Sequence, residues 1–98
     1  MVALATVAFC FPIATSAYAQ NPSDLAAAEA LFEDGRKSMD ANDFAAACPK
    51  LEESERLAPA VGTLLNLGIC YEKSHRTASA WATFKEATSA ARASGQSS

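Results

Sequence analysis

Cysteine and histidine, which supply thiolate nucleophiles, bases near neutral pH and zinc ligands, are few in this sequence. They are the three cysteines, Cys10, Cys48 and Cys70, and the one histidine, His75. A zinc site built from Cys48, Cys70 and His75 would lack a fourth ligand and the short paired spacing that structural zinc sites use. His75 is predicted instead to be a loop residue, because histidine tolerates left-handed backbone better than most residues. The sequence predicts no metal site.

Catalytic patterns are also missing. With one histidine, a Ser–His–Asp or Cys–His arrangement has a single possible base, and no glycine-rich phosphate-binding motif occurs. The carboxylates of Glu52, Glu53 and Glu55 alternate with Lys50 and Arg56, which is typical of a solvated helix face. We therefore predict no catalytic residues, no cofactor and no enzymatic activity.

The segment 1–19 at the start of the chain is apolar and contains no charged side chain. Ala17-Tyr18-Ala19 places small residues where a signal peptidase requires them, so a signal peptide over 1–19 with cleavage after Ala19 is predicted. No Lys or Arg precedes the apolar stretch, and an uncleaved inner-membrane anchor stays open as the alternative. Export to the periplasm or cell envelope is the expected location, with membrane contact only if the segment is retained.

The length and charge of the chain narrow its partners. Its 98 residues allow one small domain, and the net charge is −3. A nucleic-acid partner is not expected, because binding to the phosphate backbone needs a basic face. Half of the residues are apolar, many of them alanine, which suits closely packed helices.

Apolar residues recur every three or four positions in four segments, which predicts four amphipathic helices between residues 23 and 93. Ser23 and Thr77 are the expected N-caps of the first and fourth helices. Pro49, inside the second helix, is expected to remove one hydrogen bond and kink it. Residues 94–98 are expected to be a flexible tail. The expected boundaries are Pro22-Ser23-Asp24, Asn42-Asp43, Ala58-Pro59, Ser74-His75-Arg76-Thr77 and Gly95.

The four helices are two copies of one pair, over about residues 28–60 and 61–93. A small residue on each helix of a pair suggests that the two helices approach closely where glycine meets alanine. The shift along the sequence that aligns Gly35 with Gly68 also aligns Ala47 with Ala80, and Leu51 with Phe84.

This pattern resembles the tetratricopeptide (TPR) repeat family. The first copy departs from the family pattern at Asp34 and Ser38, where leucine and tyrosine are usual. The resemblance implies an all-α fold of two antiparallel helix pairs, a fragment of an α-solenoid, that mediates protein–protein interaction. An exported, alanine-rich chain of this kind is also similar to envelope proteins of Gram-negative bacteria. The second copy carries the family's spacing at Leu64, Leu67-Gly68, Tyr71, Ala80, Phe84 and Ala87, and the first keeps Gly35, Ala47, Leu51 and Pro59.

In that family the first helix of each pair lines a groove that takes a peptide or a partner helix. Asn66 matches an asparagine that some members use to hold a C-terminal carboxylate, but the accompanying lysines are absent here. Carboxylate binding is therefore not predicted, and ordinary packing is an open alternative for Phe32 and Leu65. The groove residues that the resemblance implies are Glu29, Phe32, Glu33, Arg36, Leu65, Asn66, Ile69 and Lys73.

The two cysteines that follow the leader are expected to pair. The second and third helices should run antiparallel around the turn at Pro59, and Cys48 and Cys70 lie at equal sequence distances on either side of it. They should therefore be neighbours, and an exported chain should oxidise them to a disulfide. Two buried free thiols are the alternative.

The fourth helix is expected to leave apolar side chains uncovered. Trp81 aligns with Cys48, whose side should face the following helix, so Trp81 and Phe84 are predicted to be partly exposed. Self-association through this helix, a bound partner or a longer parent protein would each explain such a patch. The alternative function is structural: a spacer, or the membrane-anchored N-terminal fragment of a larger envelope protein.

Overall fold

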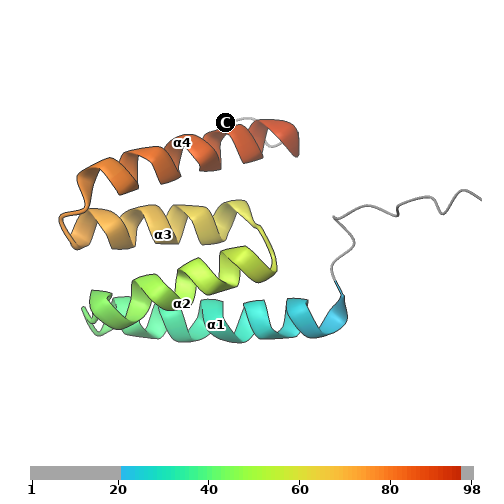
Figure 1. Ribbon diagram of the computed structural model, residues 1–98, viewed down its shortest axis with the longest axis horizontal. Helices are drawn as coiled ribbons and strands as arrows, with labels where there is room; N and C mark the ends of the chain where they lie inside the picture. Colours follow the sequence, from blue (N-terminus) through green and yellow to red (C-terminus); the bar gives the residue numbers. More distant parts are fainter. Residues whose placement is uncertain (1–20, 96–98) are drawn as a thin grey trace, which may run out of the picture.

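The computed structural model describes residues 21–95, which form four successive antiparallel helices (Figure 1). The predicted all-α fold is confirmed: α1 packs against α2, α3 packs against α4, and α2 joins the two pairs by packing against α3. The predicted signal peptide and its cleavage site, and residues 96–98 of the predicted tail, lie outside the described residues. The helices are α1 (Pro22–Asp40), α2 (Phe44–Leu57), α3 (Val61–Lys73) and α4 (Thr77–Ala93).

The first helix begins two residues earlier than a cap at Ser23 would allow. Asn21 is the N-cap, and its Oδ1 accepts a hydrogen bond of 2.8 Å from the backbone N–H of Asp24. Pro22 follows at the first helical position, where its missing N–H costs nothing. The prediction that Ser23 caps this helix is wrong, because Ser23 lies inside the first turn.

The other helix starts differ in whether a side chain caps them. Asp43, at the predicted boundary Asn42-Asp43, caps α2, and its Oδ1 accepts from the N–H of Ala46 at 3.2 Å. Arg76 is the N-cap of α4 without a side-chain bond, so the prediction that Thr77 caps α4 is wrong. Thr77 is the first residue of α4, and its hydroxyl does not replace the cap.

The two turns within the helix pairs occupy equivalent positions of the two copies and have the same backbone geometry. Asn42 (φ 57°) and His75 (φ 63°) are in the left-handed region that follows a helix end. Asp43 N–H donates to the carbonyl of Ser38 at 2.8 Å, and Arg76 N–H donates to that of Tyr71 at 2.8 Å. Both turns are Schellman motifs, and the prediction of a left-handed loop position for His75 is confirmed.

The helices of each pair approach each other at a glycine. A Cβ atom on Gly35 would lie 2.9 Å from Cγ of Leu51, and one on Gly68 would lie 2.5 Å from Cε1 of Phe84. The glycines therefore make room for a large side chain on the partner helix. The predicted close approach at Gly35 and Gly68 is therefore seen in both copies, with Leu51 and Phe84 as the nearest side chains.

The core lies where α2 and α3 meet. Helix α2 runs unbroken through Pro49, which is exposed. The residues around the seam are therefore held by two continuous helices. The buried cluster contains Ala47, Cys48, Leu51, Leu67, Cys70, Tyr71 and Ala80, with Phe32, Met39, Phe44 and Phe84 packed against it.

Substitution of the two buried glycines tests the close approach. Gly68→Ala and Gly35→Ala should each lower the free energy of unfolding by about 1–3 kcal/mol, because the facing side chain has to move. At Gly62 an added Cβ meets nothing within 4 Å, so Gly62→Ala should raise stability by about 0.4–1 kcal/mol. Urea denaturation measures all three, and equal stability of Gly68→Ala and Gly62→Ala would contradict the packing.

Candidate functional site

An open groove of about 450 Å³ lies between the first half of α1, the end of α2 and the start of α3. Three helices contribute to its wall, so its shape depends on the way α3 is joined to the first pair. Its lining residues are Leu25, Ala28, Glu29, Phe32, Glu33, Ser54, Ala58, Pro59, Ala60, Gly62 and Thr63.

The groove combines apolar side chains with two carboxylates. Leu25 is 42% exposed and Phe32 is half-buried, while Glu29 and Glu33, on the same helix, are exposed. The guanidinium carbon of Arg36 lies 5.8 Å from the centre of the Phe32 ring, beyond the lining residues. No Lys or Arg lines the groove itself. Its surface is therefore apolar and acidic.

Two polar contacts, one of them buried, position the helices around the groove. The hydroxyl of Ser54, which is 2% exposed, donates to the carbonyl of Ala28 at 2.7 Å and ties α2 to α1. Glu55 accepts from the N–H of Ala60 at 3.0 Å, which holds the start of α3, and burial raises the pKa of this carboxyl. Neither Ser54 nor Glu55 was predicted to be a site residue. A serine three positions after Leu51, on the apolar stripe of α2, was the available signal.

The structure divides the eight predicted groove residues. Glu29, Phe32 and Glu33 line the groove together, with Arg36 beside Phe32. Leu65, 45% exposed, lines a second hollow near the end of α4. Asn66, whose side-chain NH₂ donates to the carbonyl of Gly62 at 2.8 Å, lines neither hollow, and the same is true of Ile69 and Lys73.

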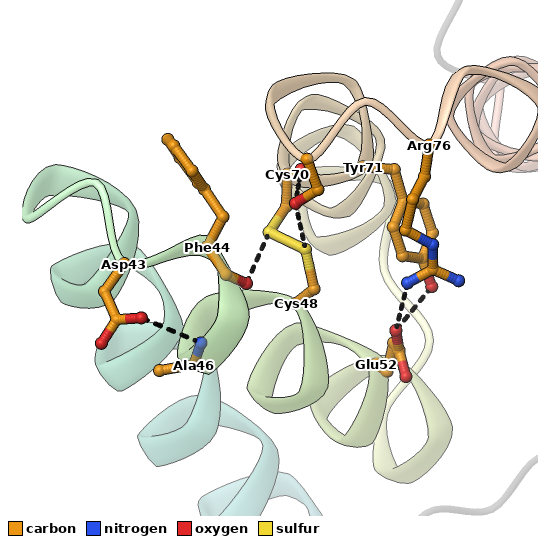
Figure 2. Close-up of a disulfide and its surroundings, with 9 residues drawn as sticks. Asp43, Phe44, Ala46, Cys48, Glu52, Cys70, Tyr71 and Arg76 are labelled. Carbon is orange, nitrogen blue, oxygen red and sulfur yellow. Dashed lines mark hydrogen bonds and ion pairs between the residues drawn. A yellow bond between two sulfur atoms is a disulfide. The ribbon is translucent and has the colours of Figure 1, made fainter.

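A disulfide joins the two helix pairs. Cys48 on α2 and Cys70 on α3 are bonded, with an S–S distance of 2.09 Å and a Cα–Cα distance of 5.7 Å (Figure 2). The pairing predicted from their equal distance to Pro59 is confirmed. Bonded sulfurs are not thiolates, so the zinc alternative with His75 has no cysteine ligand. No group of three potential metal ligands occurs within residues 21–95. The disulfide points to an oxidising, extracytoplasmic location.

A polar cluster spans the same seam one helical turn away. The hydroxyl of Tyr71 donates to Oε1 of Glu52 at 2.8 Å, and Nη1 of Arg76 lies 3.7 Å from that oxygen (Figure 2). The guanidinium carbon of Arg76 is 4.3 Å from the centre of the Tyr71 ring. Burial and then the bond to Glu52 raise the pKa of Tyr71 to about 12.

The fourth helix presents an exposed tryptophan. Trp81 is 65% exposed, and Nζ of Lys85 lies 4.4 Å from the centre of its ring. Phe84, predicted to belong to the same exposed patch, is half-buried against Gly68 and the core cluster. The exposed part of the α4 face is therefore centred on Trp81 and Lys85.

Comparisons with protein-family models, curated proteins and solved structures give no significant match. None of the helices described between residues 21 and 95 combines the length and the hydropathy of a membrane span.

Removal of the disulfide should weaken the junction between the pairs. The bond closes a loop between residues 22 positions apart, so Cys48→Ala with Cys70→Ala should cost about 3 kcal/mol of unfolding free energy on the chain-entropy model. Urea denaturation measures the loss, and the wild type in reductant should show a similar one. An intact mass that does not rise by two hydrogen atoms on reduction would contradict the bond.

The polar cluster should make stability depend on alkaline pH. Tyr71 holds its proton more tightly when folded, since its pKa of about 12 lies above the ordinary 10.0. Its contribution is thus complete below about pH 10 and is lost as the pH rises through 12, a change of roughly 2 kcal/mol at most once solvent screening is allowed for. Tyrosinate absorbance should show this titration, and Glu52→Gln should lower the pKa. A midpoint near 10 in the folded protein would contradict the cluster.

Proposed function

We propose that this protein is an exported, TPR-like interaction module that binds a protein or peptide segment in the groove between α1 and α3. The family resemblance supports the proposal, together with two structural features that recur at equivalent positions of the two copies. These are the Schellman turns at Asn42 and His75, and the contacts of Gly35 with Leu51 and of Gly68 with Phe84. Such a repeat is a scaffold for a binding surface.

The chemistry of the groove lining is the main support for this function. Leu25 and Phe32 offer solvent-accessible apolar contact area, and Glu29 and Glu33 add negative charge without a basic residue in the lining. The ligand that complements this surface is an extended or helical segment in which an apolar side chain is flanked by Lys or Arg. An acidic or uniformly polar segment would be repelled or would leave the apolar surface wet.

The proposed location is the periplasm or cell envelope. The disulfide between Cys48 and Cys70 supports an oxidising compartment, and the apolar segment over residues 1–19 supports export. Retention of that segment would instead anchor the module to the inner membrane. Binding, without catalysis, is the proposed activity in either case.

Charge reversal in the groove tests the function. Glu29→Lys with Glu33→Lys should weaken binding of a fluorescent peptide containing Leu or Phe between lysines by at least about tenfold, as loss of two favourable charges and gain of two repulsive ones implies. Fluorescence anisotropy measures the affinity. Both side chains are exposed, so circular dichroism and the unfolding midpoint should stay unchanged.

The matched control reverses an exposed carboxylate outside the groove. Glu72→Lys, near the end of α3, should leave the peptide affinity within about twofold after correction for net charge and salt. Equal binding of peptides with flanking Lys and flanking Glu, or of all variants, would refute a groove binder. That result would favour the structural alternative, a spacer.

A further inference from the structure

The exposed face of α4 is the repeat counterpart of the face by which α2 holds α3. The shift that aligns the two copies places Trp81 at the position of Cys48 and Lys85 at that of Glu52. Within the chain, Cys48 bonds Cys70 of α3, and Glu52 contacts Tyr71 and the following Arg76. Helix α4 therefore presents the positions that form a helix junction in the first copy.

The outer face of α1 is the counterpart of the other side of that junction. The same shift relates Lys37 to Cys70, Ser38 to Tyr71, and Asp43 to Arg76. Lys37 and Asp43 are exposed. The helix cap uses only Oδ1 of Asp43, so the carboxylate keeps its negative charge and can still form an ion pair. The α1 face and the α4 face thus lie on opposite ends of the row of helices (Figure 1).

The charges at the matched positions are reversed together. In the α2–α3 junction, the acidic partner of the ion pair is Glu52 on α2 and the basic partner is Arg76, just after α3. At the two open faces the signs are exchanged: Lys85 on α4 stands at the position of Glu52, and Asp43, just before α2, stands at the position of Arg76. Because both signs are exchanged, Lys85 and Asp43 would still attract each other. They can meet only when the α4 face of one molecule contacts the α1 face of another.

We infer that the α4 face binds the α1 face of a second copy of this chain, head to tail, in the register of the α2–α3 junction. Lys85 then faces Asp43 of the second copy, and the exposed ring of Trp81 is covered by its α1 near Lys37, a cation that suits an aromatic face. This surface is distinct from the groove and does not depend on the proposed peptide binding.

The alternative arrangement, α4 against α4 around a two-fold axis, is disfavoured by charge. It would bring together two copies of a face whose charged residue beside Trp81 is Lys85. The one acidic residue of α4, Glu86, corresponds to Glu53, which pairs with Arg56 within α2 rather than across the junction. A head-to-tail contact of this kind leaves one face open at each end, so copies add in a row.

The proposed contact between α4 and the α1 of a second copy should be weaker than the α2–α3 junction within the chain. Asp34 of α1 occupies the position of the buried Leu67, and no disulfide can form between Trp81 and Lys37. Less apolar area is buried and more of the attraction is electrostatic, so association should fall as salt is raised.

Complementation of two variants tests the inference on the protein recovered from the exporting cell. Sedimentation velocity up to roughly 1 mM should show wild-type association that continues beyond a dimer. Trp81→Ala removes the large apolar side chain of the α4 face, and Asp34→Arg places a long cation on the α1 face that meets Lys85. Each should weaken association at least about tenfold. Mixed together, they should form a 1:1 dimer and stop, because each supplies the intact face that the other lacks.

Both substituted side chains are exposed, and circular dichroism should confirm that each variant is folded. Glu86→Gln, an exposed change on another face of α4, is the matched control and should associate like the wild type. A monomeric wild type overturns the inference. So does a Trp81→Ala chain that still associates, or a mixture that remains monomeric. Association of Asp34→Arg equal to the wild type would replace it with the α4–α4 contact.

Discussion

The spacing of the helices within each pair depends on two glycines that leave room for a large side chain. Leu51 lies fully buried against Gly35, and Phe84 lies against Gly68, so each pair closes around one bulky residue. A chain rich in alanine has few large side chains to fill a core, and it gains most from each one when the facing helix comes close.

The two kinds of helix junction solve different problems. Within a pair, a short Schellman turn aligns the helices and small residues let them touch. Between the pairs, α2 and α3 are held by the Cys48–Cys70 bond and by Tyr71, which reaches Glu52 across the seam. The buried core cluster also lies at this seam, but a small domain has little apolar area to bury, so covalent and polar links add to the apolar packing.

The sequence was sufficient for the parts of the fold that depend on periodicity and spacing. The four helices, the Asp43 cap, the left-handed His75 and the disulfide all have short-range or symmetric signals. The N-cap at Asn21 was missed because serine, at position 23, is an equally good cap by residue type. Pro22 favours Asn21 as the cap, because proline is well suited to the first helical position. The partners of Gly35 and Gly68 were missed because spacing shows that helices approach, without showing which side chain enters the gap.

The candidate site was less predictable than the fold. Glu29, Phe32 and Glu33 share one helix face, so their proximity in the groove follows from helical spacing alone. The separation of Leu65 from them depends on the angle between α1 and α3, which no single-sequence pattern encodes. Ser54 was equally hidden, since its bond to the carbonyl of Ala28 joins two helices and a hydroxyl in the sequence does not reveal its acceptor.

The disulfide also changes what a cut in the backbone can do. Cys48 and Cys70 enclose most of α2, the connection at Ala58-Pro59-Ala60 and most of α3 in one covalent ring. A protease that opens the exposed connection produces two polypeptides that remain one molecule, with the halves of the groove still tethered to each other. In a compartment where proteases are common and thiol reductants are scarce, the bond therefore protects the integrity of the module even after its chain has been broken.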